Sequence, residues 1–203
     1  DAYGWEKLIT ERLNKHYYED YGFETRTVRF HNIFGPQGTW EGGREKAPAA
    51  FCRKVAVSKL TGNPVVEVWG DGEQTRSFCY IDDCLEGLYR LMHSDYREPL
   101  NLGQDRMVSI NQLADIVADI AGTEIEKKHI PGPQGVRGRN SDNSKLRQVL
   151  GWEPQISLEE GLSRTYAWIE KQVADKLELG GETAQEDLSH SKLLLRNKVG
   201  SSE

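Results

Sequence analysis

The sequence is poor in the residues that build metal centres, disulfide frameworks and membrane spans. It has only three cysteines, Cys52, Cys79 and Cys84, which lack CxxC spacing and a matching histidine pattern. We therefore expect no metal site and no disulfide framework, and we interpret the three residues as reduced thiols that pack in a core. No apolar run in the sequence approaches the roughly 18 residues that a transmembrane helix needs.

Positive charge is not in excess either. The 26 lysines and arginines are outnumbered by 32 aspartates and glutamates, and the net charge is −6. This balance excludes a polybasic membrane anchor and gives no nucleic-acid-binding surface. The composition, with 37% hydrophobic residues, is typical of a soluble, mildly acidic protein. We expect it to be cytoplasmic, with no nucleic-acid or membrane partner.

The chain lacks an initiator methionine and begins inside a helix-forming run, so we expect it to be part of a longer protein. Tyr3 and Lys7 stand four positions apart in this run and share one face of the predicted helix. A nearby ammonium group favours the phenolate and lowers the pKa of a tyrosine, so that Tyr3 can accept a proton from a substrate hydroxyl. The same spacing also fits a surface helix in which a cation lies near an aromatic ring.

Predicted helices alternate with predicted strands along the chain, which is typical of an α/β fold. Helical spacing of apolar residues predicts helices over residues 3–21, 48–60, 82–93, 109–122, 143–150 and 157–177. Asp82 or Asp83 is expected to cap the third of these helices. Runs of β-branched and aromatic residues predict strands over residues 25–34, 65–69, 74–81, 99–103 and 124–130. The glycine-rich segment 35–44 is predicted to be a long loop, which is typical of a functional lid.

Three blocks of the sequence have recognisable spacing: Tyr3-x-x-x-Lys7, the strand end Arg29–Pro36, and Trp69–Phe78 followed by Asp82. These blocks resemble the C-terminal half of the extended short-chain dehydrogenase/reductase family, the nucleotide-sugar epimerases and dehydratases. The resemblance implies an α/β fold in which the C-terminal part of a Rossmann-type parallel-sheet domain is interwoven with a small α/β substrate-binding domain.

That domain organisation is expected over residues 1–179. Strands near residues 25–34 and 98–102 would belong to the large domain, and strands near 64–69 and 124–130 to the small one. Because apolar density falls from Gly180 onward, we expect residues 180–203 to form a disordered tail.

Two longer segments, Gly38–Lys54 and Gly132–Asn143, resemble the members of this family that act on GDP-mannose and invert its C3 and C5 centres. The resemblance implies a bound NAD, which oxidises the C4 hydroxyl to a ketone and later returns the hydride. It also implies that Tyr3 is the base at C4, that Lys7 holds the nicotinamide ribose, and that Lys46 belongs to a Cys/Lys acid–base pair. A lysine suits that task only if its pKa falls towards neutrality.

The resemblance further implies a set of substrate-binding positions: Asn32, Glu45, Lys46, Ala47, Lys54, Gln74, Thr75, Arg76 and Arg139. Arg76 and Arg139 match phosphate-contacting positions, and arginine offers a diphosphate the bidentate geometry that lysine does not. Taken alone, Arg76 also fits a surface residue paired with Asp82 or Asp83. We interpret His31 as a structural hydrogen-bonding residue rather than a general base.

The cysteine partner of Lys46 and the Gly-rich loop that cradles a pyrophosphate are both missing from this sequence. We therefore expect no turnover by the chain alone. One alternative function is a related 4-epimerase, 4,6-dehydratase or decarboxylase, although Lys46 in its Gly-Gly-Arg-Glu-Lys context is evidence against it. Another is a non-catalytic nucleotide-sugar-binding or dimerisation module, in which the first helix packs in a homodimer interface as it does in the family.

Overall fold

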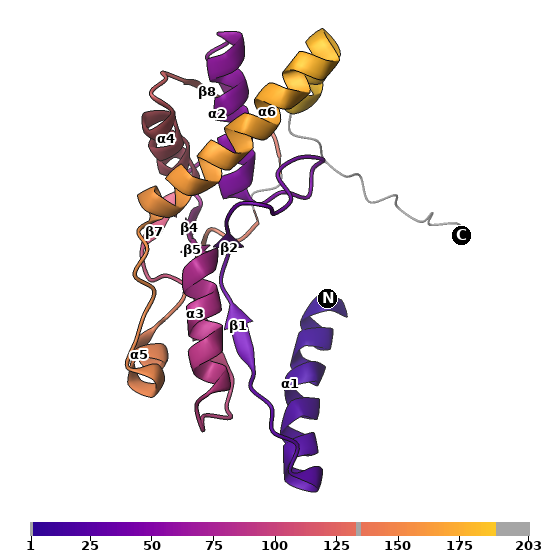
Figure 1. Ribbon diagram of the computed structural model, residues 1–203, viewed down its shortest axis with the longest axis vertical. Helices are drawn as coiled ribbons and strands as arrows, with labels where there is room; N and C mark the ends of the chain where they lie inside the picture. Colours follow the sequence, from indigo (N-terminus) through magenta and orange to yellow (C-terminus); the bar gives the residue numbers. More distant parts are fainter. Residues whose placement is uncertain (1, 133–134, 190–203) are drawn as a thin grey trace, which may run out of the picture. The chain divides into compact units, whose positions relative to one another are not determined.

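The computed structural model describes residues 2–132 and 135–189, which form an α/β protein of two compact units (Figure 1). The first unit consists of Asp1–Ile33, Arg76–Met107 and Gly138–Leu158, and the second of Phe34–Thr75, Val108–Arg137 and Glu159–Glu203. Within the described residues, no helix has the length and apolar character that crossing a bilayer requires.

The first unit is built on a pair of parallel strands. Its elements are α1 (Ala2–Tyr21), β1 (Val28–Phe30), β5 (Cys79–Tyr80), α3 (Ile81–Met92), β6 (Leu100–Leu102), β9 (Gly138–Arg139) and α5 (Ser144–Leu150). β1 pairs with β6 in parallel, with Val28 opposite Leu100. Beside this pair lies a core of buried apolar residues: Cys79, Cys84, Leu91, Leu100, Leu102 and Leu146. Parallel pairing with helical connections is the arrangement that the family resemblance predicts.

The second unit contains the other parallel pair. Its elements are α2 (Ala47–Thr61), β3 (Val65–Trp69), α4 (Ile110–Ala121), β8 (Glu126–Ile130) and α6 (Leu158–Ser189), whose first residue closes the first unit. β3 pairs with β8 in parallel, with Val65 opposite Glu126. α4 starts in a capping box, in which Ser109 and Gln112 exchange side-chain to backbone hydrogen bonds.

The two units are interwoven along the chain, as predicted. The chain leaves one unit for the other within β2 (Ile33–Phe34), β4 (Thr75–Ser77) and β7 (Met107–Ser109). β1 and β6 fall in the first unit, and β3 and β8 fall in the second.

Two strands are shorter than predicted. The strand expected over 25–34 is interrupted between β1 and β2, where Asn32 has a positive φ of 47°. A left-handed residue cannot continue the extended backbone, and asparagine tolerates this conformation better than most residues. The Asn32 side chain donates to the Ser77 carbonyl at 2.8 Å. The strand expected over 74–81 is likewise split into β4 and β5.

The predicted cap of α3 is wrong. The N-cap residue is Tyr80, which makes no side-chain capping bond, and both Asp82 and Asp83 lie in the first turn. Carboxylates in a first turn still interact favourably with the helix dipole. Asp83 is buried, and its carboxylate accepts a hydrogen bond from the Ile156 backbone N–H at 2.8 Å. It therefore ties α3 to the segment that precedes α6.

The C-terminal helix is longer than predicted. α6 continues through Gly180 and Gly181 to Ser189, past the expected end near residue 177. Residues 180–189 are therefore helical rather than part of a disordered tail, and residues 190–203 lie outside the described residues. Each glycine costs a helix about 1 kcal/mol relative to alanine. Burial of Leu188, which is 2% exposed, offsets part of that cost.

Candidate functional site

Tyr3 and Lys7 lie one turn apart on α1, as the spacing predicts. Lys7 Nζ lies 5.2 Å from the centroid of the Tyr3 ring, a cation–π distance. Both side chains are exposed, and Tyr3 is 67% exposed. The first unit therefore presents a phenol and an ammonium group together on one accessible helix face.

α1 is attached to the first unit by polar contacts. None of its residues, all of which are described, is buried. Arg29 of β1 donates to both carboxylate oxygens of Glu11 at 2.7 and 2.6 Å, and this hydrogen bonding lowers the pKa of Glu11. Asn14 contacts Thr25 and Thr27 through hydrogen bonds of 3.4 and 3.2 Å. A cavity of about 360 Å³ lies between α1, the two threonines Thr25 and Thr27, and residues 97–99.

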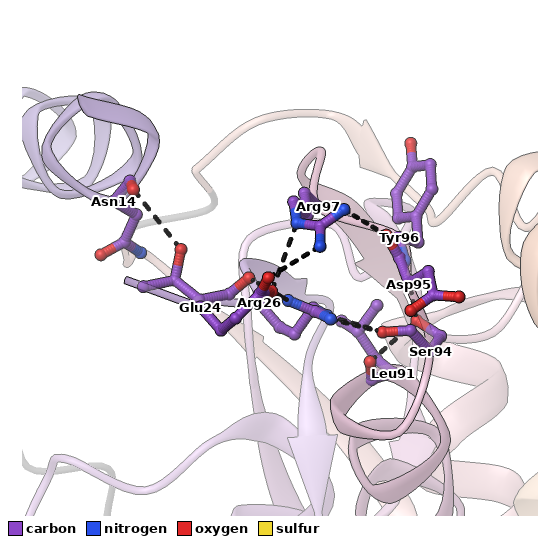
Figure 2. Close-up of polar contacts among 9 residues, drawn as sticks. Asn14, Glu24, Arg26, Leu91, Ser94, Asp95, Tyr96 and Arg97 are labelled. Atoms are coloured by element: carbon purple, nitrogen blue, oxygen red, sulfur yellow. Dashed lines mark hydrogen bonds and ion pairs between the residues drawn. The ribbon is translucent and has the colours of Figure 1, made fainter. Parts of the chain in front are cut away.

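A charged network fixes the turn that follows α1 (Figure 2). Glu24 accepts hydrogen bonds from Arg97 at 2.7 Å and from Arg26 at 2.8 Å, and these bonds lower its pKa to about 2. Arg26 also donates twice to the Ser94 carbonyl, at 2.8 and 2.6 Å. The Arg97 guanidinium stacks over the Tyr18 ring of α1 at 4.5 Å. The network thus links the end of α1 to the connection between α3 and β6.

Arg76 and Arg139 lie close together in the first unit, on the neighbouring strands β4 and β9. Burial lowers the pKa of Arg76, and the positive charge of Arg139 lowers it further. Two guanidinium groups that repel each other form a region of positive potential, which an anion would relieve. The two arginines predicted to contact phosphate therefore lie on neighbouring strands, within range of each other's charge.

His31 borders this cationic pair. Burial lowers its pKa, a hydrogen bond with Asn101 opposes this change, and Arg139 lowers the pKa further. A Cβ atom on Gly103 would lie 2.6 Å from the His31 Cβ, so the ring is packed closely against the backbone after β6. A neutral, packed imidazole agrees with the structural role expected for His31.

Lys46 stands at the start of α2, as its N-cap residue, with an exposed side chain. Ala47 is the first residue of the helix and is half-buried. The Glu45 side chain pairs with Arg53 at 2.8 Å and accepts a hydrogen bond from the Gly43 N–H at 2.7 Å. Both Glu45 oxygens are thus used to hold the loop before α2.

The remaining predicted substrate positions are mostly buried. Lys54 is 7% exposed and donates to the Glu67 carbonyl at 2.6 Å. Burial, assisted by the charge of Arg53, lowers the pKa of Lys54 to about 8. Gln74 donates to the Trp69 carbonyl at 3.2 Å, and its buried Oε1 has no hydrogen-bond partner among the described residues. The Thr75 N–H donates to the Arg137 carbonyl.

The predicted site residues therefore form two groups, each within its own unit. The first unit holds Tyr3, Lys7, Asn32, Arg76 and Arg139, and the second holds Glu45, Lys46, Ala47, Lys54, Gln74 and Thr75. The sequence reasoning gave no role to Arg53, whose buried guanidinium organises the second group. Its only signal is a charged residue within the otherwise apolar run Phe51–Val57 that also includes Lys54.

The three cysteines do not take part in either group. All three are buried and free, which confirms the packing role expected for them. Burial raises the pKa of Cys79 to about 12 and also raises the pKa of Cys52 and Cys84. Thiols in such environments are poor acids and bases near neutral pH.

Residues 1–103 match the model of the NAD dependent epimerase/dehydratase family. The chain belongs to this family. It is 55% identical over 184 residues to GDP-mannose 3,5-epimerase 1 of Oryza sativa subsp. indica, covering 91% of this chain and 48% of the relative. It is 54% identical over 184 residues to GDP-mannose 3,5-epimerase of Arabidopsis thaliana, with the same coverage of 91% and 48%.

A solved structure agrees with the fold. The crystal structure of UDP-glucose 4-epimerase with UDP-glucose from Thermotoga maritima has a TM-score of 0.76 and 31% identity, covering 84% of this chain and 54% of that one. The chain spans about half the length of the curated relatives it matches.

Proposed function

We propose that this chain is the substrate-binding and acid–base half of a nucleotide-sugar 3,5-epimerase that acts on GDP-mannose and uses NAD. Identity of 55% to a GDP-mannose 3,5-epimerase over 91% of the chain carries the proposal. The solved 4-epimerase is only 31% identical, which favours the 3,5-epimerase over the 4-epimerase alternative. The free, buried thiols support a reducing, cytoplasmic location.

The face of α1 that carries Tyr3 and Lys7 fits the nicotinamide-ribose end of NAD, because it presents an exposed hydroxyl and an exposed ammonium side by side. When bound, NAD supplies the hydride acceptor and donor for C4 of the sugar. Tyr3, as the phenolate that the positive charge of Lys7 stabilises, takes the proton of the C4 hydroxyl and becomes a neutral phenol. The reverse transfer restores the hydroxyl.

Arg76 and Arg139 bind the diphosphate of the substrate, and their mutual repulsion makes an anion between them favourable. Lys46 exchanges protons at C3 and C5 once the C4 ketone has made those positions acidic. Its exposed position at the start of α2 leaves the side chain accessible to a sugar. The proposal also includes Lys54 and Gln74 as contacts to the nucleotide sugar.

A homodimer partner is part of the proposal. α1 exposes a series of large apolar side chains: Tyr3, Trp5, Leu8, Ile9, Leu13, Tyr17 and Tyr21. Such a surface is unfavourable in water and is typical of one that packs against another protein surface. The same observation favours the dimerisation module as the second candidate function.

The proposed function is tested by incubating the full-length protein that contains this chain with GDP-mannose and NAD in D₂O. We expect deuterium at both C3 and C5, detected by NMR. Inversion at C4 without deuterium at C3 or C5 would instead identify a 4-epimerase. No reaction, together with no calorimetric heat of GDP binding to the folded 203-residue chain, would leave only the dimerisation module.

A further inference from the structure

Arg53 connects three segments of the second unit. Its side chain is 2% exposed, and a charge at that depth must be fully paired to be tolerated. The guanidinium donates to the Glu45 carboxylate at 2.8 Å, to the Trp40 carbonyl at 3.1 Å, and to the Leu188 carbonyl. We call residues 40–45 the pre-helix segment, since they lead into Lys46 and α2.

The bond to Leu188 reaches the C-terminal part of α6, which the structure describes as far as Ser189. A buried guanidinium needs acceptors and a buried carbonyl needs a donor, so the two groups satisfy each other. Arg53 therefore holds the Leu188 carbonyl of α6 and the pre-helix segment with one rigid fork of donors.

A second contact joins the same two segments closer to the middle of α6. Lys176 forms an ion pair with Glu41 and lies 5.6 Å from the centroid of the Trp40 ring. Lys176 lies on an exposed face of the helix. Lys176 thus joins α6 directly to Trp40 and Glu41. Arg53 of α2 joins the pre-helix segment to the Leu188 carbonyl of α6.

The pre-helix segment has little internal structure to hold it. It contains no helix or strand, and Gly42 and Gly43 both have a φ of 86°. Its one internal side-chain bond runs from the Gly43 N–H to Glu45, whose other oxygen is held by Arg53. The direction in which Lys46 leaves the backbone therefore depends on contacts made from outside the segment.

We propose that Arg53 and Lys176 are positioning residues for Lys46: they fix the pre-helix segment to the C-terminal part of α6 and so set the place from which Lys46 reaches the sugar. This role rests on the proposed function of Lys46. Through Lys46, the C-terminal part of α6 would then affect proton transfer at C3 and C5 rather than binding of the nucleotide.

Hydrogen exchange on the 203-residue chain tests the structural half of the proposal. In Lys176→Gln, which keeps a good helix former on an exposed surface, the Gly43 amide should exchange about threefold faster, as expected when an exposed ion pair is lost. Lys176→Arg should restore the rate. Lys171→Gln, an exposed lysine on the same helix, is the matched control and should leave the rate unchanged. Equal Gly43 rates in Lys176→Gln and wild type would overturn the proposal.

Deuterium wash-in by the full-length protein tests the catalytic half. Lys176→Gln should slow wash-in at C3 and C5 about threefold while the KM for GDP-mannose stays unchanged, and Lys176→Arg should recover the rate. Faster Gly43 exchange with an unchanged wash-in rate would show a purely structural contact and overturn the positioning role. If wild type shows no wash-in, the proposed function fails, and the role of Lys46 fails with it.

Discussion

α1 and α2 carry the two groups proposed to move protons, and the structure holds the two helices in different ways. None of the residues of α1 is buried, and its attachments are the exposed pair Arg29–Glu11 and the charged network around Glu24. α2 buries all of Phe51–Ser58, including the charged residues Arg53 and Lys54. Lys46 therefore begins a helix that is rigidly packed, whereas Tyr3 stands on a helix held by surface charges.

The difference indicates which of the two groups is held more firmly by the residues of this chain. Removing one partner of a buried charge pair strongly lowers the free energy of unfolding, whereas an exposed pair contributes little to it and is screened by salt. Lys46 therefore stands at the start of a more firmly packed helix than Tyr3 does. Tyr3 and Lys7 stand on a helix whose large apolar side chains are exposed.

The largest effect should come from Arg53. Arg53→Met leaves the carboxylate of Glu45 buried without its cation, so we expect the free energy of unfolding to fall by about 3–5 kcal/mol. Urea denaturation measures the change. Adding Glu45→Gln should recover part of the loss, because no uncompensated charge then remains. A fall below about 1 kcal/mol in Arg53→Met would contradict the central role of this residue.

The next effect concerns pH and Lys54. Its pKa is about 8 in the folded chain against an ordinary 10.5. Between these values the unfolded chain binds more protons, so the free energy of unfolding rises with pH by a total of about 3 kcal/mol. Urea denaturation at pH 7, 8.5 and 10 should show this rise as the difference between wild type and Lys54→Met. If the free energy of unfolding changed with pH in the same way in both proteins, folding would not lower the pKa of Lys54, and the prediction would be contradicted.

The smallest effect should be at α1. Arg29→Gln removes an exposed pair, so the free energy of unfolding should change by less than about 1 kcal/mol. Amides of α1 should nevertheless exchange faster, and 1 M NaCl should have the same effect on wild type while α2 is unaffected. Arg90→Gln, which breaks an exposed pair with Glu86 within α3, is the matched control. Equal salt effects on α1 and α2 would remove the contrast between them.

The sequence predicted the features that depend on local spacing. The shared face of Tyr3 and Lys7 follows from their four-residue separation, and α2 is predicted to within a residue at each end. The family resemblance placed the strands that became β1 and β6 in one domain, but their pairing is seen only in the structure, since no local pattern specifies which parallel strands meet.

Other features depend on contacts that no local pattern reveals. The positive φ of Asn32, which divides β1 from β2, is stabilised by a bond to Ser77, which is distant in sequence. α6 continues past Gly180 to Ser189, and Arg53 binds the Leu188 carbonyl in this continuation. The role of Arg53 itself is visible only once its burial is known, because an arginine within a helix is ordinarily a surface residue.

The proposed role of Lys46 is tested most directly by deuterium wash-in with the Lys46→Ala variant of the full-length protein. Our account predicts that incorporation at C3 and C5 falls at least about a hundredfold, as expected when a general acid–base group is lost, while GDP binding measured by calorimetry is retained. Lys171→Ala, an exposed lysine outside both groups of site residues, should behave as wild type. Unchanged incorporation in Lys46→Ala would contradict the account.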